Sequence, residues 1–178
     1  MNKKILVPVV VTVVLAAALY GVAVGLLPVT NANRLADLKS ILTTLLPGSE
    51  TFTVEPYSGE DANISAVYKA ENGYVVETVT DGYADEITML VGVSNDGKVT
   101  GVVVRDQHET WGLGQKAAND VPFLTQLLLD KETLTVGENV DGVTGATVTS
   151  KAVVKAVNSA KAFVTGADVS SSATEWGG

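Results

Sequence analysis

The sequence predicts an α+β protein in which helices pack around an antiparallel sheet, joined to a membrane anchor. Three observations predict it: a long uncharged apolar run near the N-terminus, a series of strand-like segments, and an amphipathic stretch near the C-terminus. The 178 residues are enough for one domain and an anchor, and too few for a two-domain enzyme.

The anchor is predicted over residues 1–27, because residues 5–27 are apolar throughout and carry no charge. A helix of that length, at about 1.5 Å per residue, crosses a hydrocarbon core of about 30 Å. The run is longer than the roughly 7–15 apolar residues of a cleavable signal peptide, which is the alternative interpretation. Lys3 and Lys4 favour a cytoplasmic N-terminus, with the remaining domain on the extracellular or periplasmic side.

The rest of the chain divides into a juxtamembrane helix (28–48), a folded domain (49–168) and a loose tail (169–178). Leucines recur at helical spacing before Pro47 and Gly48 end the first helix. The Asn95-Asp96-Gly97 turn predicts a hairpin between the last two strand-like runs. We expect strands at 64–68, 74–80, 87–93 and 99–105, and helices at 115–129 and 150–164.

Composition excludes several classes of site. The chain has no Cys and one His, which rules out disulfides, Cys-ligated clusters and His-rich metal sites. Its net charge of −8 argues against a nucleic-acid binder. The acidic residues are scattered, so no metal site is expected, and no side chain is assigned a catalytic role.

Residues 141–150, which read DGVTGATVTS, lead directly into the predicted C-terminal helix. They carry the hydroxyl groups of Thr144, Thr147, Thr149 and Ser150, while Gly145 and Ala146 leave the backbone open to close approach. A helix N-terminus with free N–H groups can bind a phosphate. The alternative is an ordinary loop in which Thr149 or Ser150 caps the helix.

A second segment, residues 109–114 (ETWGLG), could lie against a planar ligand, with Trp111 stacking on it. Residues 112–117 also fit the G-x-G-x-x-A dinucleotide fingerprint, but that motif should leave a parallel βαβ strand. An antiparallel hairpin is expected before Gly112, so we interpret the match as coincidence. His108, beside Glu109, is expected to be a surface residue.

Together these segments resemble the G subunit of the Rnf electron-transport complex. They are also similar to the C subunit of the sodium-translocating NADH:quinone oxidoreductase and to the wider FMN-binding domain family. The resemblance rests on an N-terminal anchor followed by a helix ending in LLPG, on ETxGLG at 109–114, and on D-x-x-[ST]-G-A-T followed by [VI]-T-S at 141–150.

The resemblance implies a covalent FMN whose phosphate is esterified to Thr147 by a separate flavin transferase that uses FAD and magnesium. The other implied cofactor-binding residues are Thr144, Gly145, Ala146, Thr149, Ser150, Glu109, Thr110, Trp111, Gly112, Leu113 and Gly114. The loop of Asp81, Gly82 and Tyr83 is a further candidate. Relatives usually carry Pro at the position of Trp111, so this loop is expected to follow a different path or to stack on the flavin.

The implied function is that of an electron carrier in the ion-translocating ferredoxin:NAD oxidoreductase complex, partnered by other membrane and redox subunits and by membrane lipid. Three alternatives remain: the C subunit of the related quinone oxidoreductase, a stand-alone tethered electron-transfer flavoprotein, and a cofactor-free anchored binding module.

Overall fold

The computed structural model describes residues 36–112 and 114–167. The chain divides into two compact units, Met1–Ser40 and Ile41–Gly178. Residues 36–45 are helical, as the leucine spacing predicts, and Pro47 and Gly48 follow in a turn. The predicted anchor at 1–27 and the predicted tail at 169–178 lie outside the described residues. Within the described part, none of the helices has the length and apolar character that crossing a membrane requires.

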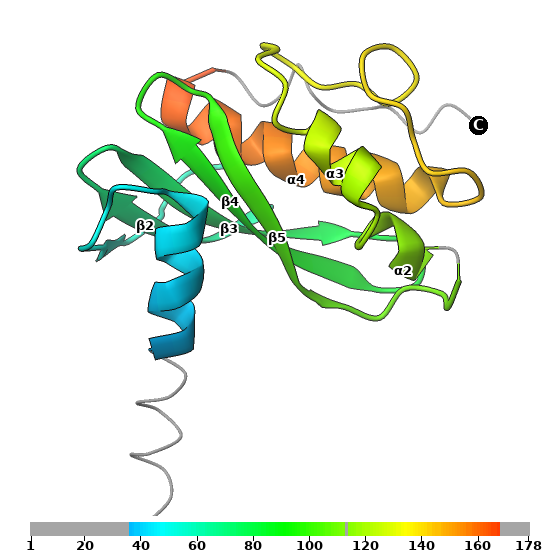
Figure 1. The fold of residues 1–178 in the computed structure, drawn as a ribbon, viewed down its shortest axis with the longest axis horizontal. Coiled ribbons are helices and arrows are strands. Elements are labelled where there is room, and N and C mark those ends of the chain that lie inside the picture. The colour runs from blue at the N-terminus through cyan, green and yellow to red at the C-terminus, as the bar shows by residue number, and fades with distance from the viewer. Residues whose placement is uncertain (1–35, 113, 168–178) are drawn as a thin grey trace, which may run out of the picture. The chain divides into compact units, whose positions relative to one another are not determined.

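The second unit is built on a five-stranded antiparallel sheet in which sequential strands are neighbours (Figure 1). All four predicted strands are confirmed, each extended by a residue or two. The sheet also has a first strand, β1, which is too short to show a periodicity. Its strands are β1 (Thr53–Glu55), β2 (Ile64–Ala70), β3 (Gly73–Asp81), β4 (Glu86–Ser94) and β5 (Val99–Gln107).

The β4–β5 hairpin turns where the sequence predicts it. Gly97 has a φ of 82°, in the left-handed region that favours glycine, and its N–H donates to the Ser94 carbonyl at 2.9 Å. Strand pairing on either side runs from Val93–Val99 to Ile87–Gln107. The register of the hairpin therefore follows from a turn that the sequence predicts.

The expectation of one helix over 115–129 is wrong. Two short helices are found there, α2 (Gly114–Ala117) and α3 (Val121–Gln126). The Asp120 carboxylate accepts a hydrogen bond from the Phe123 N–H at 2.9 Å, so it caps the start of a new helix. Pro122, which has no N–H to donate to a preceding turn, stands in the first turn of α3 and separates it from α2.

The long helix α4 (Thr147–Thr165) covers one face of the sheet (Figure 1). It begins at Thr147, three residues before the predicted start at Ser150. Small buried residues on its inner side, Ala152, Ala156 and Ala160, pack in the same core as Val76, Met89 and Val91 of the central strands. The Thr80 hydroxyl donates to the Ala152 carbonyl at 3.2 Å, which links β3 directly to α4.

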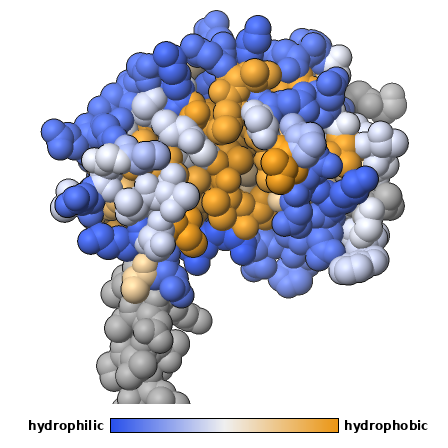
Figure 2. Space-filling model, viewed as in Figure 1, coloured by the Kyte–Doolittle hydropathy of each residue, from blue (hydrophilic) through white to orange (hydrophobic). Residues whose placement is uncertain are grey.

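The opposite face of the sheet is covered in part by Leu42, Leu45 and Leu46, which are all buried. The Leu45 carbonyl accepts a hydrogen bond from the Thr100 hydroxyl of β5. A Cβ at Gly92 would overlap the same carbonyl, so the glycine permits this close approach. Figure 2 shows apolar residues gathered in the middle of the displayed face, ringed by polar ones.

Candidate functional site

A pocket of about 440 Å³ lies where three loops meet beside the N-terminus of α4. One wall comes from the β3–β4 hairpin, a second from the segment between β5 and α2, and a third from the start of α4. The two segments that the sequence singled out therefore meet at one place. The pocket is lined by Tyr83, Glu109, Thr110, Gly114, Gly145, Ala146, Thr147, Val148 and Thr149.

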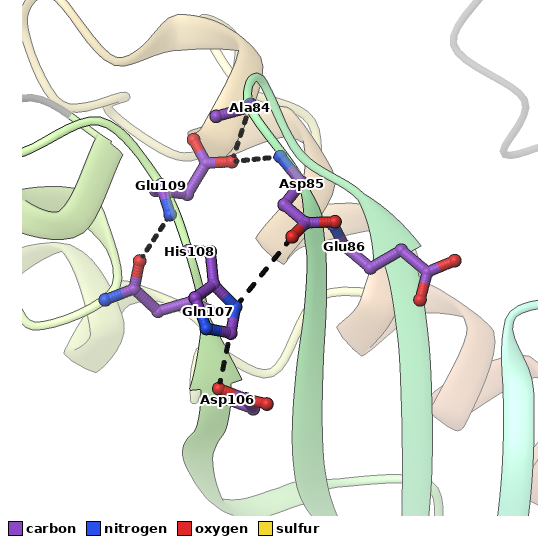
Figure 3. Close-up of polar contacts among 7 residues, drawn as sticks. All are labelled: Ala84, Asp85, Glu86, Asp106, Gln107, His108 and Glu109. Carbon is purple, nitrogen blue, oxygen red and sulfur yellow. Dashed lines mark hydrogen bonds and ion pairs between the residues drawn. The ribbon is translucent and has the colours of Figure 1, made fainter.

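Glu109 is the buried charged residue of the pocket, with 7% of its surface exposed. Its Oε1 accepts hydrogen bonds from the backbone N–H groups of Ala84 (3.0 Å) and Asp85 (3.4 Å) in the hairpin (Figure 3). Its Oε2 accepts a bond from the Thr149 hydroxyl, at 2.5 Å between oxygens. The Glu109 N–H donates to Gln107 Oε1 at 2.9 Å.

These contacts decide the ionisation of Glu109. Burial raises the pKa of the carboxyl group, but the hydrogen bonds from Thr149 and the hairpin backbone favour the charged form. The net result is a pKa below the usual value for glutamate. The pocket therefore contains a carboxylate that is ionised at neutral pH and held by hydrogen-bond donors.

Two glycines make room for this carboxylate. A Cβ at Gly82 would overlap Glu109 Oε1, and a Cβ at Gly114 would overlap Oε2. The same Cβ at Gly114 would lie 2.8 Å from the Thr149 hydroxyl oxygen. Gly114 thus brings α2 close to the first turn of α4, in addition to leaving the backbone open.

The first turn of α4 presents Thr147 to the pocket. Thr147 is exposed, whereas Thr149 and Ser150 are 1% and 0% exposed. Gly145 precedes the helix with a φ of 80°, in the left-handed region that favours glycine. The first turn of α4, which is described in full, carries no acidic side chain of its own, so the positive end of the helix dipole is open to an anion.

The expectation that Thr149 or Ser150 caps this helix is wrong. Ala146 occupies the N-cap position, with no hydrogen bond from its side chain. The Ser150 hydroxyl instead accepts from the Val143 N–H at 3.0 Å and donates to the Ala146 carbonyl at 2.9 Å. The helix starts earlier than predicted because Ser150 stabilises the turn that precedes it.

Other residues from the two motifs do not line the pocket. Thr144 and Gly112 are exposed outside its lining, and Trp111 is 85% exposed. Leu113 lies outside the described residues. The prediction that Trp111 stacks on a ligand therefore stays a prediction.

Tyr83 and Val148 line the pocket but are not among the cofactor-binding residues predicted from the two motifs. Tyr83 belongs to the loop at 81–83 that was a further candidate. Val148 carried no chemical signal of its own, although it stands between two threonines of the motif. Its position on the first turn of α4 is what brings it to the pocket.

His108 lies at the surface next to the pocket segment. Its side chain is 72% exposed, and Nδ1 is 3.8 Å from Asp85 Oδ2 and 3.9 Å from Asp106 Oδ1 (Figure 3). Among residues 36–112 and 114–167, no group of three His, Asp or Glu side chains is arranged to hold a metal ion.

The glycines at 112–114 follow an antiparallel strand. β5 pairs with β4 in antiparallel register, and α2 is only four residues long. A dinucleotide fingerprint requires a parallel strand and a helix long enough to offer its N-terminus to a pyrophosphate. The geometry agrees with the interpretation that this match is a coincidence.

A pocket beside a helix N-terminus, on an antiparallel sheet with one long packed helix, is the architecture of a small ligand-binding α+β domain. Residues 82–162 match the FMN-binding domain family, and this segment contains every residue that lines the pocket.

Relatives with curated names extend the match. The G subunit of the Na⁺-translocating ferredoxin:NAD⁺ oxidoreductase complex of Acetobacterium woodii is 42% identical over 95 residues, 48% of this chain and 46% of that protein. The G subunit of the proton-translocating ferredoxin:NAD⁺ oxidoreductase complex of Clostridium ljungdahlii is 40% identical over 110 residues, 55% of this chain and 59% of that protein. The alignments with these two relatives thus span about half the length of each.

The G subunit of the ion-translocating oxidoreductase complex of Methanosarcina acetivorans is 32% identical over an alignment of 186 positions, gaps included, which covers 92% of this chain and 96% of that protein. The chain belongs to the family of ion-translocating oxidoreductase complex G subunits.

Proposed function

We propose that this protein is the flavoprotein G subunit of an ion-translocating ferredoxin:NAD oxidoreductase complex, with FMN bound covalently to Thr147. The observation that carries the proposal is the pocket at the start of α4, where an exposed Thr147 faces the segment at 109–114. The family match supports FMN binding, and the names of the relatives support a G subunit of such a complex.

The pocket suits a flavin phosphate and part of its ring system. Its volume of about 440 Å³ is in the range of small-molecule pockets. The N-terminus of α4 offers backbone N–H groups to a phosphate, and Gly145 and Ala146 add no bulky side chain there. Tyr83, which is 72% exposed, and Thr110 line the pocket and are placed to contact the ring system.

The proposed linkage joins Oγ1 of Thr147 to the FMN phosphate as a phosphoester. A flavin transferase would form it from FAD, with AMP as the leaving group and the proton lost from the threonine hydroxyl. A threonine hydroxyl is a weak nucleophile and needs a separate base or metal for activation. Thr147 is accessible to such an enzyme because it is exposed.

The flavin would supply the redox chemistry, and the protein would supply its position and its electrostatic surroundings. The chain would act as an electron carrier between neighbouring subunits and would have no separate turnover. We further propose that residues 1–27 anchor it in the membrane with the N-terminus in the cytoplasm, so that the pocket domain lies on the extracellular or periplasmic side.

The covalent linkage is tested by in-gel fluorescence after denaturation. The full chain is expressed with and without a flavin transferase, together with Thr147→Ala and the control Thr51→Ala, an exposed threonine outside both motifs. We expect ultraviolet fluorescence in the wild type and in Thr51→Ala only when the transferase is present, and none in Thr147→Ala. A dark wild-type band, with the transferase active on a known substrate, would overturn the covalent site and favour a cofactor-free binding module.

The complex is tested by mild detergent extraction from native membranes, followed by affinity purification of the tagged chain. Integral and redox subunits that co-purify in fixed ratio would support a role within a complex. Their identities would distinguish the ferredoxin complex from the related quinone oxidoreductase. A fluorescent chain that purifies alone would instead indicate a stand-alone tethered flavoprotein.

A further inference from the structure

Both carboxylate oxygens of Glu109 are hydrogen-bonded to other walls of the pocket. One oxygen holds the β3–β4 hairpin through the N–H groups of Ala84 and Asp85. The other holds the first turn of α4 through the Thr149 hydroxyl. Figure 3 shows the bonds to the hairpin. Glu109 itself belongs to the segment that connects β5 to α2, so a single side chain joins all three segments around the pocket.

We infer that Glu109 is a positioning residue, which holds the three walls together and occupies the Thr149 hydroxyl, so that Thr147 is the one hydroxyl of residues 141–150 that is offered to the pocket. This inference rests on the proposed function, because it concerns how the flavin attachment site is selected. Glu109 acts through Thr149 and the hairpin, and no contact between its carboxylate and the flavin is required.

The four hydroxyls of the motif differ in ways that support this selection. Thr149 is buried and donates to Glu109, and Ser150 is buried and bonded to backbone groups of Val143 and Ala146. Thr144 is exposed but does not line the pocket. Thr147 is both exposed and part of the lining.

The charge of Glu109 is essential to this arrangement. Within the described residues, no Lys, Arg or His side chain forms an ion pair with it, so hydrogen-bond donors alone compensate the carboxylate. A glutamine at this position keeps one acceptor oxygen instead of two, and its neutral amide accepts weaker hydrogen bonds than a carboxylate does. The neutral variant should therefore loosen the pocket walls although its shape is nearly unchanged.

The first test needs no flavin. Hydrogen–deuterium exchange is measured by mass spectrometry on the full chain in detergent, for the wild type, Glu109→Gln and the control Glu71→Gln. Glu71 is exposed and lies in the β2–β3 turn, at the other end of β3 from the pocket hairpin. We expect the backbone amides of residues 84–85 to exchange roughly tenfold faster in Glu109→Gln, because their hydrogen bonds to a charged acceptor are lost. Their exchange should be unchanged in Glu71→Gln. Exchange in Glu109→Gln equal to the wild type would overturn the inference.

A pH series separates a charge effect from a packing effect. The folded-state pKa of Glu109 is below its ordinary value of about 4.3, so the charged form persists below that pH and is lost as pH falls through the lowered pKa. Protection at 84–85, corrected for intrinsic exchange, should drop over that acidic range in the wild type and stay low and flat in Glu109→Gln. If the difference in protection between the wild type and Glu109→Gln does not change with pH, the charge of Glu109 does not hold the hairpin. The other titratable residues on the surrounding segments are Asp81, Tyr83, Asp85, Glu86, Asp106, His108, Lys116 and Lys151.

The last test asks which hydroxyl is modified. The full chain is treated with flavin transferase, FAD and magnesium, and the flavin-bearing peptide is sequenced. In the wild type and in Glu71→Gln we expect flavin on Thr147 alone. In Glu109→Gln we expect the yield of flavin on Thr147 to be at least about tenfold lower, or the flavin to be divided between Thr147 and another hydroxyl. Wild-type yield and site in Glu109→Gln would overturn the inference.

A second variant keeps the test valid if Glu109→Gln does not fold. Thr149→Val removes only the hydroxyl and leaves the hairpin bonds of Glu109 in place. We expect faster exchange in peptides that span 143–150 and a reduced yield at Thr147; unchanged values would overturn the inference. If the wild type accepts no flavin at all, the proposed function fails, while the exchange results still decide the role of Glu109.

Discussion

Ser150 illustrates how single side chains shape this site. It is fully buried, and its hydroxyl bonds to two backbone groups of the loop that precedes α4. It therefore fixes the turn from which Thr147 is presented. Read from sequence alone, the same serine suggested a helix cap, because capping and loop-bridging use the same hydroxyl chemistry.

Ser150→Ala should destabilise the protein by about 1–2 kcal/mol, because the Val143 N–H would lose its acceptor in a partly buried loop. Chemical denaturation followed by circular dichroism measures this loss. The exposed Ser58→Ala is the control and should change stability by less than about 0.5 kcal/mol. A Ser150→Ala protein as stable as the wild type would show that this bond does not hold the loop.

At the scale of elements, α4 packs in the core and also holds the long segment between α3 and the pocket by hydrogen bonds. Asn158, on α4, is 7% exposed. Its Oδ1 accepts from the Leu134 N–H at 3.0 Å, and its Nδ2 donates to the Leu134 carbonyl at 2.8 Å. The irregular segment is thus tied to the helix by a side chain that satisfies both backbone groups of one buried residue.

Asn158→Ala should lower the free energy of unfolding by about 2–4 kcal/mol, because it leaves both backbone groups of buried Leu134 without partners. The midpoint of urea unfolding reports the change. As a comparison, Asn119→Ala removes a single bond at an exposed position, from Nδ2 to the Gln115 carbonyl, and should have a small effect. Equal effects of the two substitutions would contradict the structural role of Asn158.

At the scale of the whole molecule, the sheet needs cover on both faces. α4 covers one face, and buried Leu42, Leu45 and Leu46 cover part of the other, which includes Val75 and Leu90 at 0% exposure. The Thr100 hydroxyl also bonds to the Leu45 carbonyl. The end of the first helix is therefore part of the core of the second compact unit, which begins at Ile41.

We expect a fragment of residues 41–167 to fold cooperatively and a fragment of residues 50–167 to be largely unfolded. Loss of three buried leucines should cost more than about 5 kcal/mol, which is comparable to the entire stability of a typical domain. Thermal unfolding followed by circular dichroism compares the two fragments. A cooperative transition at the same temperature in both would contradict this prediction.

The sequence by itself determined the elements that depend on local rules. The strand-like runs and the turn at Gly97 predicted four of the five strands and their hairpin, because strand propensity and turn chemistry act over a few residues. The Ala and Val spacing predicted α4. The sequence also identified residues 109–114 and 144–150 as candidate binding residues, because their glycines and hydroxyls are unusual beside a helix start.

Only the tertiary structure decided which of those residues share a pocket and what each does there. Tyr83 and Thr147 line the same pocket, Trp111 and Thr144 lie outside the lining, and the Thr149 hydroxyl is bonded to Glu109. The tertiary structure also divided residues 115–129 into two helices. The physical reason is that these outcomes depend on contacts between residues far apart in the chain, such as Glu109 with Ala84 and Thr149, and on burial that local patterns do not encode.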